Sequence, residues 1–131
     1  MEPRPLRILL VEDHAETAQT TAHLLRAYGY EVRVAGNGVT AWGALQADTP
    51  DVVLLDLGLP EMDGWQLAKR VTEDWSNTND KRPLLVAVTG YGQEEDRRRS
   101  AQAGIDLHLT KPVDPRQLQN LLNRFHRIVA E

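Results

Sequence analysis

Five short runs of apolar residues alternate along the chain with segments in which apolar positions recur every three or four residues. The central run, Val52–Leu55, has four consecutive apolar side chains and stops at the carboxylate of Asp56. Such a run predicts a strand buried on both faces, as in the middle of a parallel sheet. Gly58 and Pro60 follow at once, so the strand is expected to end at Asp56. The other predicted strands are Leu6–Val11, Tyr30–Ala35, Leu84–Val88 and Leu107–Leu109.

The segments between these runs have the spacing of helices with one apolar face. They are Ala15–Tyr28, a short segment around Trp42, a segment opened by Asp63 as N-cap, Gln93–Gln102, and a last segment capped by Asp114. The run Tyr30–Ala35 alternates apolar and charged residues, which is typical of a strand at the sheet edge. Strand and helix alternate five times, and right-handed crossovers then give a parallel sheet with helices on both faces. The predicted fold is α/β, an open three-layer α/β/α sandwich.

Length and charge narrow the classes of protein further. The 131 residues suit a single domain, 1–131, in which residues 1–5 form a short N-terminal tail. A net charge of -4 gives no reason to expect direct binding to nucleic acid or to an anionic membrane. There are no cysteines, and the early apolar run Ile8–Val11 is too short for a signal or membrane segment. We therefore expect a cytoplasmic protein.

Residues able to bind a phosphate or a metal follow the buried strands. They are Glu12 and Asp13 after the first, Asp56 at the end of the third, Thr89 after the fourth and Lys111 after the fifth. Because the carboxyl ends of parallel strands share one edge, we expect these residues to meet in one cleft. Three carboxylates close together repel one another unless a cation intervenes. An all-oxygen set of this kind suits Mg²⁺.

The predicted cluster has the parts that phosphoryl transfer requires. That reaction needs a nucleophile in line with the phosphorus and positive charge on the equatorial oxygens. Asp56 would be the nucleophile, since carboxylates serve as phosphoryl acceptors, and Mg²⁺ with Lys111 would supply the charge.

Short motifs surround these residues at characteristic spacings. They are Leu9-Leu10-Val11-Glu12-Asp13, Asp56 with Leu59-Pro60 and Met62-Asp63-Gly64, Thr89-Gly90, Ala103-Gly104 and Lys111-Pro112. Over essentially its whole length the chain resembles the response-regulator receiver domain (CheY-like) of two-component signalling. The resemblance implies a flavodoxin-like fold with five parallel strands in the order 2-1-3-4-5.

The resemblance also implies roles for individual residues. It implies that Asp56 is the phosphoacceptor and that Lys111–Pro112 is a cis peptide. It implies that Mg²⁺ is bound by Glu12, Asp13, Asp56 and the carbonyl of Gly58. It further implies that Thr89 and Lys111 bind the phosphoryl oxygens.

One position departs from the family pattern. Many receivers have Tyr or Phe three residues before the lysine, and this chain has His108 there, as receivers of hybrid sensor kinases often do. We expect Thr89 and His108 to be the switch residues.

The implied function is a step in a phosphorelay. A sensor histidine kinase or a histidine phosphotransfer protein would donate the phosphoryl group from a phosphohistidine, and the modified chain would change a partner-binding surface. No turnover of a separate substrate is expected, only slow loss of the phosphoryl group.

Three other readings are compatible with parts of the pattern. An aspartyl phosphatase needs a second Asp two residues after its nucleophile, where this chain has Gly58. A flavin-binding protein shares the architecture, but the acidic edge and the absence of a phosphate loop disfavour it. The third is a receiver-like interaction module that is not phosphorylated. Both a stand-alone regulator and a part of a hybrid kinase fit the sequence.

Overall fold

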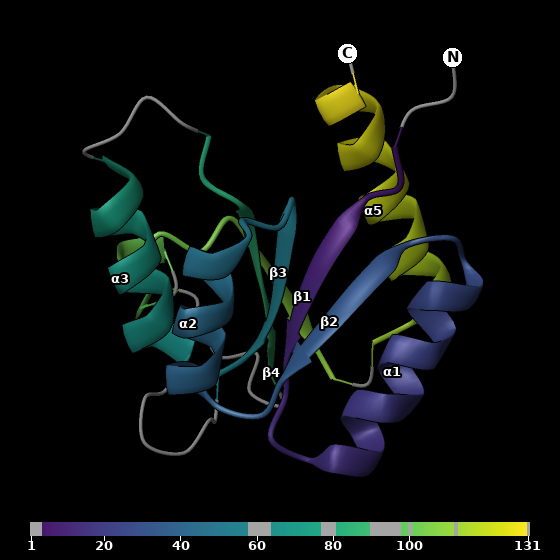
Figure 1. Ribbon diagram of the computed structural model, residues 1–131, viewed down its shortest axis with the longest axis horizontal. Helices are drawn as coiled ribbons and strands as arrows, with labels where there is room; N and C mark the ends of the chain where they lie inside the picture. The colour runs from purple at the N-terminus through teal and green to yellow at the C-terminus, as the bar shows by residue number, and fades with distance from the viewer. Residues whose placement is uncertain are drawn as a thin grey trace.

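The computed structural model describes residues 4–57, 64–76, 81–89, 98–99, 101–111 and 113–130, with side chains not described for Thr89 and 127–130. Its five strands form one parallel sheet in the order β2-β1-β3-β4-β5 (Figure 1). The strands are β1 (Arg7–Val11), β2 (Glu31–Ala35), β3 (Val52–Asp56), β4 (Leu84–Thr89) and β5 (Leu107–Thr110). The helices are α1 (Ala15–Ala27), α2 (Gly38–Ala47), α3 (Gly64–Ser76) and α5 (Pro115–Ala130).

This arrangement confirms the predicted three-layer α/β/α sandwich. In Figure 1, α1 and α5 cover one face of the sheet and α2 and α3 cover the other. The alternating strand β2 lies at the edge and the continuous apolar strand β3 lies at the centre, as their patterns predict. Of the helix expected at 93–102, residues 98–99 and 101–102 are described and are helical, and the rest lie outside the described residues.

The helix caps agree with the sequence where they can be seen. Asp114 accepts a hydrogen bond at 2.9 Å from the backbone N–H of Arg116, which satisfies a donor in the first turn of α5. Asp63, the expected N-cap of α3, lies outside the described residues. No helix in the described ranges combines the length and the apolar character needed to cross a membrane.

Two apolar layers hold the sandwich together. Successive residues of β1 and β3 point to opposite faces, so each strand contributes to both layers, and each contains four consecutive apolar residues. On the α2 and α3 side, Leu9 and Val53 pack with Leu67; on the α1 and α5 side, Ile8 and Val52 pack with Leu122. Burying one such side chain stabilises the fold by about 1.5–3 kcal/mol.

A buried carboxylate aligns β3 with β1 at their amino ends. Asp51, just before β3, accepts a hydrogen bond at 2.9 Å from the backbone N–H of Arg7. Its two oxygens also accept from the guanidinium of Arg4, both at 2.7 Å. This bidentate pair places Arg4, in the segment expected to be a tail, within the fold.

A second carboxylate links β4 and β5 in the same way. Asp106, just before β5, accepts a hydrogen bond at 2.8 Å from the backbone N–H of Leu85 and two from Arg82, at 2.9 and 2.7 Å. Each carboxylate therefore links the start of its own strand to the start of a neighbour. Because the strands are parallel, fixing their amino ends also fixes where their carboxyl ends lie.

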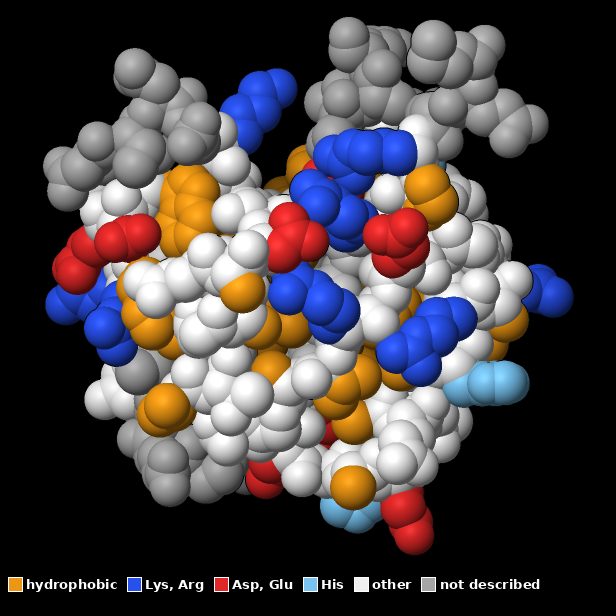
Figure 2. Space-filling view, viewed as in Figure 1, with side chains coloured by type: hydrophobic (Ala, Val, Ile, Leu, Met, Phe, Trp, Pro, Cys, Tyr) orange, Lys and Arg blue, Asp and Glu red, His pale blue; other side chains and the backbone are white. Residues whose placement is uncertain are grey.

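Opposite charges lie close together on the surface. Figure 2 shows Lys and Arg side chains beside Asp and Glu side chains over the middle of the face in view. Arg7, for example, pairs with Asp48 at 3.0 Å.

The Asp51 carboxylate is expected to contribute to stability only where it is ionised. Burial raises its pKa, but the hydrogen bonds from Arg4 and from the backbone of Arg7 outweigh burial, and the pKa lies below its usual value. Its contribution is therefore full above the unfolded-state pKa of about 3.9 and is lost as the pH falls through the lower folded-state pKa. At neutral pH, Asp51→Asn should lower the free energy of unfolding by about 2 kcal/mol in urea denaturation, and by less at about pH 3.

Asp48→Asn is the matched control for this experiment. Its side chain is 58% exposed, against 9% for Asp51, so losing its ion pair with Arg7 should cost less than about 1 kcal/mol. Equal losses in the two variants would contradict the role given to Asp51.

Candidate functional site

The acids expected at the sheet edge do lie together. Glu12 and Asp13 follow β1, and Asp56 ends the adjacent strand β3. One carboxylate oxygen from each of the three lies within 4.8 Å of the others. Lys111 follows β5, and its Nζ is 3.5 Å from Oδ2 of Asp56. Residues almost a hundred positions apart therefore share one site, and their roles remain predictions.

The remaining predicted site residues are described less fully. Thr89 ends β4 at the same edge, opposite Thr110 of β5, but its side chain is outside the described part. His108 lies in β5 opposite Ala87, with a half-buried side chain, and its switch role stays a prediction. Gly58 and Pro112 lie outside the described residues, as does the predicted cis peptide.

Backbone contacts hold Glu12 in place. Its own N–H donates to the carbonyl of Ala35 at 3.0 Å, and its Oε1 accepts from the N–H of His14 at 3.2 Å. The Glu12 side chain is enclosed, with 8% of its surface exposed. His14 also caps α1, because its Nδ1 accepts from the N–H of Thr17 at 3.2 Å. The position of His14, directly after the acidic pair at a helix start, is the sequence signal for this supporting role.

The environment of Glu12 makes its negative charge costly. Burial raises its pKa, and the nearby Asp56 carboxylate raises it further. The N–H of His14 and the Lys111 ammonium act in the opposite direction without cancelling this increase. A second positive charge among these oxygens would favour the ionised form.

The donor set fits a hard divalent cation. The three residues offer only carboxylate oxygens, with no nitrogen or sulfur ligand among them. Mg²⁺ prefers one or two carboxylates and completes its shell with water and phosphate oxygens. The acids therefore suit Mg²⁺ better than a metal that selects His or Cys.

A pocket of about 500 Å³ adjoins these acids. Glu12, Asp56 and Lys111 line its polar part, and Thr17 and Thr21 of α1 form part of its side. Its other lining residues are apolar: Leu10, Val11, Leu54, Leu55, Val88, Val113 and Leu118. The carboxylate of Asp56, which lines the polar part of this pocket, is 15% exposed.

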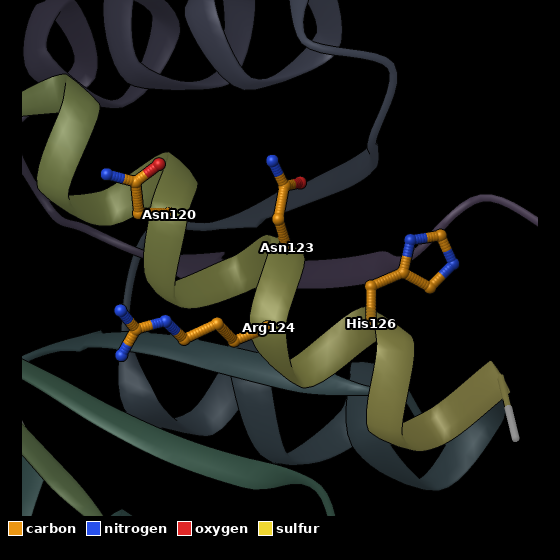
Figure 3. A pocket seen from close by; sticks show the side chains of 4 residues that line it. All are labelled: Asn120, Asn123, Arg124 and His126. Atoms are coloured by element: carbon orange, nitrogen blue, oxygen red, sulfur yellow. The ribbon is translucent and has the colours of Figure 1, made fainter.

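A second hollow, on α5, has different character. Figure 3 shows its lining residues, Asn120, Asn123, Arg124 and His126, on successive turns of the helix, with side chains that do not converge on one point. Asn123 accepts a hydrogen bond from the hydroxyl of Tyr30, and Nε2 of His126 is 2.9 Å from the carbonyl oxygen of Arg4. These contacts tie α5 to the residue before β2 and to the N-terminal segment, which is a structural role.

Comparison with known proteins gives the family. Residues 8–123 match the response regulator receiver domain. The chain is 36% identical over 118 residues to an uncharacterized 14.6 kDa protein in the sodA1 3′ region of Leptolyngbya boryana, covering 90% of this chain and 88% of that protein. It is 32% identical over 123 residues to the sensor histidine kinase GacS of Pseudomonas protegens, covering 93% of this chain but 13% of the kinase.

A solved structure supports the same family assignment. A CheY-like receiver domain protein from Methanospirillum hungatei superposes with a TM-score of 0.83 at 28% identity, with 94% of each chain covered. The chain therefore belongs to the response regulator receiver domain family of two-component signalling. Receiver domains of this family are signalling modules, and the strand order β2-β1-β3-β4-β5 is that of the CheY-like fold.

Mg²⁺ is expected to stabilise the folded chain. A ligand that binds only the folded state, at a hundred times its Kd, raises the free energy of unfolding by about 2.7 kcal/mol. Urea denaturation in MgCl₂ and in EDTA measures this difference.

Glu12→Gln is the informative variant for this experiment. It removes one anionic oxygen and the repulsion with Asp56, so it should be more stable than the wild type in EDTA and gain less from Mg²⁺. An equal Mg²⁺ gain in both proteins would argue against a metal at these acids.

Proposed function

We propose that the chain accepts a phosphoryl group on Asp56, in a Mg²⁺-dependent transfer from a phosphohistidine. The observation that carries the proposal is the placement of the Lys111 ammonium 3.5 Å from the Asp56 carboxylate, with Glu12 and Asp13 beside it. A strand-end aspartate with both an ammonium and a potential metal site has what an acyl phosphate needs to form. Membership in the receiver family supports this reading.

In the proposed reaction one carboxylate oxygen of Asp56 attacks the phosphorus. The new O–P bond forms as the P–N bond to the donor imidazole breaks, and the released nitrogen takes up a proton. Lys111 pairs with the phosphoryl oxygens, whose charge must be balanced in the transition state. The hydroxyl of Thr89, at the end of β4, is proposed to bind another of these oxygens.

Mg²⁺ would be held by the carboxylates of Glu12, Asp13 and Asp56 and by the carbonyl of Gly58. When bound, it neutralises charge on the transferring group. The chain contributes the placement: Glu12 is held by backbone contacts on both sides, and Asp56 is fixed by the pairing of β3 with β1 and β4.

Phosphorylation would change a partner-binding surface of the domain. We propose that Thr89 and His108, on the adjacent strands β4 and β5, respond to the phosphoryl group and alter a partner-binding face. The donor would be a sensor histidine kinase or a histidine phosphotransfer protein, a reading supported by the similarity to part of GacS. We further propose that residues 1–131 act as one cytoplasmic domain that turns over no separate substrate and binds neither nucleic acid nor membrane.

Acetyl phosphate tests the acceptor directly. With MgCl₂, the intact chain should gain the mass of one phosphoryl group, and it should gain none in EDTA or as Asp56→Asn. Asp48→Asn, an exposed acid at the opposite edge of the sheet, should be phosphorylated like the wild type. An unmodified wild-type chain would instead favour a receiver-like interaction module that is not phosphorylated.

Lys111→Ala should slow phosphorylation without unfolding the chain. Removing one preorganised charge from a phosphoryl transition state costs about a hundredfold in rate. Lys69→Ala, an exposed lysine on α3, is the control and should keep the wild-type rate. A wild-type rate in Lys111→Ala, measured by mass spectrometry over time, would remove this residue from the mechanism.

A further inference from the structure

The first residue of α3 lies against the end of the strand that bears Asp56. Gly64 is buried, and its N–H donates to the carbonyl of Leu57 at 3.2 Å. Leu57 directly follows Asp56 and is 2% exposed. The start of α3 and the end of β3 are thus joined by a backbone hydrogen bond one residue away from the proposed phosphoacceptor.

The approach leaves no room for a side chain at position 64. A Cβ added there would lie 2.7 Å from Cα of Leu57 and 2.8 Å from the carbonyl oxygen of Asp56. Ordinary contacts of this kind are 3.4 Å or longer. The two groups are backbone atoms and cannot rotate away, so either α3 or the peptide between Asp56 and Leu57 must shift by several tenths of an ångström.

The surrounding packing limits where such a shift can go. Asp56 is paired with Val88 of β4 on one side. Leu57 packs in the same apolar layer as Leu67 and Ala68 of α3, so the helix cannot retreat without opening that layer. A side chain at position 64 therefore acts on the peptide that carries the Asp56 carboxylate.

We propose that Gly64 is a positioning residue: by lacking a Cβ, it sets the direction of the Asp56 carboxylate relative to Glu12, Asp13 and Lys111. The inference rests on the proposed function. Reactive groups must be held to about 0.5 Å, and a misplacement of about 1 Å can cost a hundredfold in rate. Gly64→Ala should thus reduce phosphorylation far more than its effect on stability accounts for.

Two other glycines provide matched controls. Gly43, in α2, has nothing within 4 Å of an added Cβ, so Gly43→Ala should leave the reaction unchanged. Gly104 has a φ of +87°, and its added Cβ would lie 2.1 Å from Oγ1 of Thr72, so Gly104→Ala must be strained. Because Gly104 precedes β5, it lies at the edge of the sheet opposite Asp56.

The experiment compares initial rates of phosphorylation by acetyl phosphate in saturating MgCl₂. Rates are divided by the folded fraction, measured by circular dichroism at the assay temperature. We expect Gly64→Ala to be at least about tenfold slower, and Gly43→Ala and Gly104→Ala to match the wild type per folded molecule. A wild-type rate in Gly64→Ala overturns the inference, as does an equal loss in Gly104→Ala. Failure of the wild type itself to react overturns the proposed function.

A measurement on the wild-type chain covers the case in which Gly64→Ala does not fold. The amide resonance of Gly64 should shift during a Mg²⁺ titration with the same midpoint as the phosphorylation rate, whereas that of Gly43 should not. A Gly64 resonance that does not respond would overturn the inference.

Discussion

The repulsion among three carboxylates at one end of the sheet is the constraint on which the site depends. The pairing of β1 with β3 brings Glu12 and Asp13 next to Asp56, and the burial of Glu12 limits the screening of its charge by water, whereas Asp13 is exposed. Among the residues that the structure describes, the ammonium of Lys111 lies 3.5 Å from the Asp56 carboxylate. The folded chain thus stores an electrostatic cost that a divalent cation would relieve. Under the proposed function, metal binding at such a site would be coupled to the reactivity of Asp56.

Contacts at the amino ends of the strands, opposite the acids, help to hold the acids in place. Asp51 and Asp106 each accept a hydrogen bond from a backbone amide near the start of a neighbouring strand, and each accepts two more from a guanidinium. A slip of one residue in β1 or β3 would turn every side chain to the other face and separate the acids. The ion pairs at the amino ends of the strands therefore help to fix the strand register on which the grouping of the acids at the carboxyl ends depends.

Sequence reasoning succeeded where one physical cause leaves a local signature. The uninterrupted apolar run before Asp56 predicted a strand buried on both faces. The alternation of apolar and charged residues in Tyr30–Ala35 predicted an edge strand. Parallel topology then placed Lys111 with the distant acids, and the chemistry of phosphoryl transfer predicted roles for Asp56 and Lys111, whereas the roles of Thr89 and Gly58 came from the family resemblance. Individual hydrogen bonds and close backbone approaches leave no such signature. The hydrogen bonds of Glu12 with Ala35 and His14, and the lack of room for a side chain at Gly64, needed coordinates.

The contacts of Arg4 extend the folding unit beyond the first strand. Its guanidinium binds Asp51 beneath the central strand, and its carbonyl oxygen lies 2.9 Å from His126 near the far end of α5. One residue thus bridges the sheet and the last helix. Expression boundaries drawn at β1 would delete this bridge. A minimal domain for biophysical work should therefore include Arg4.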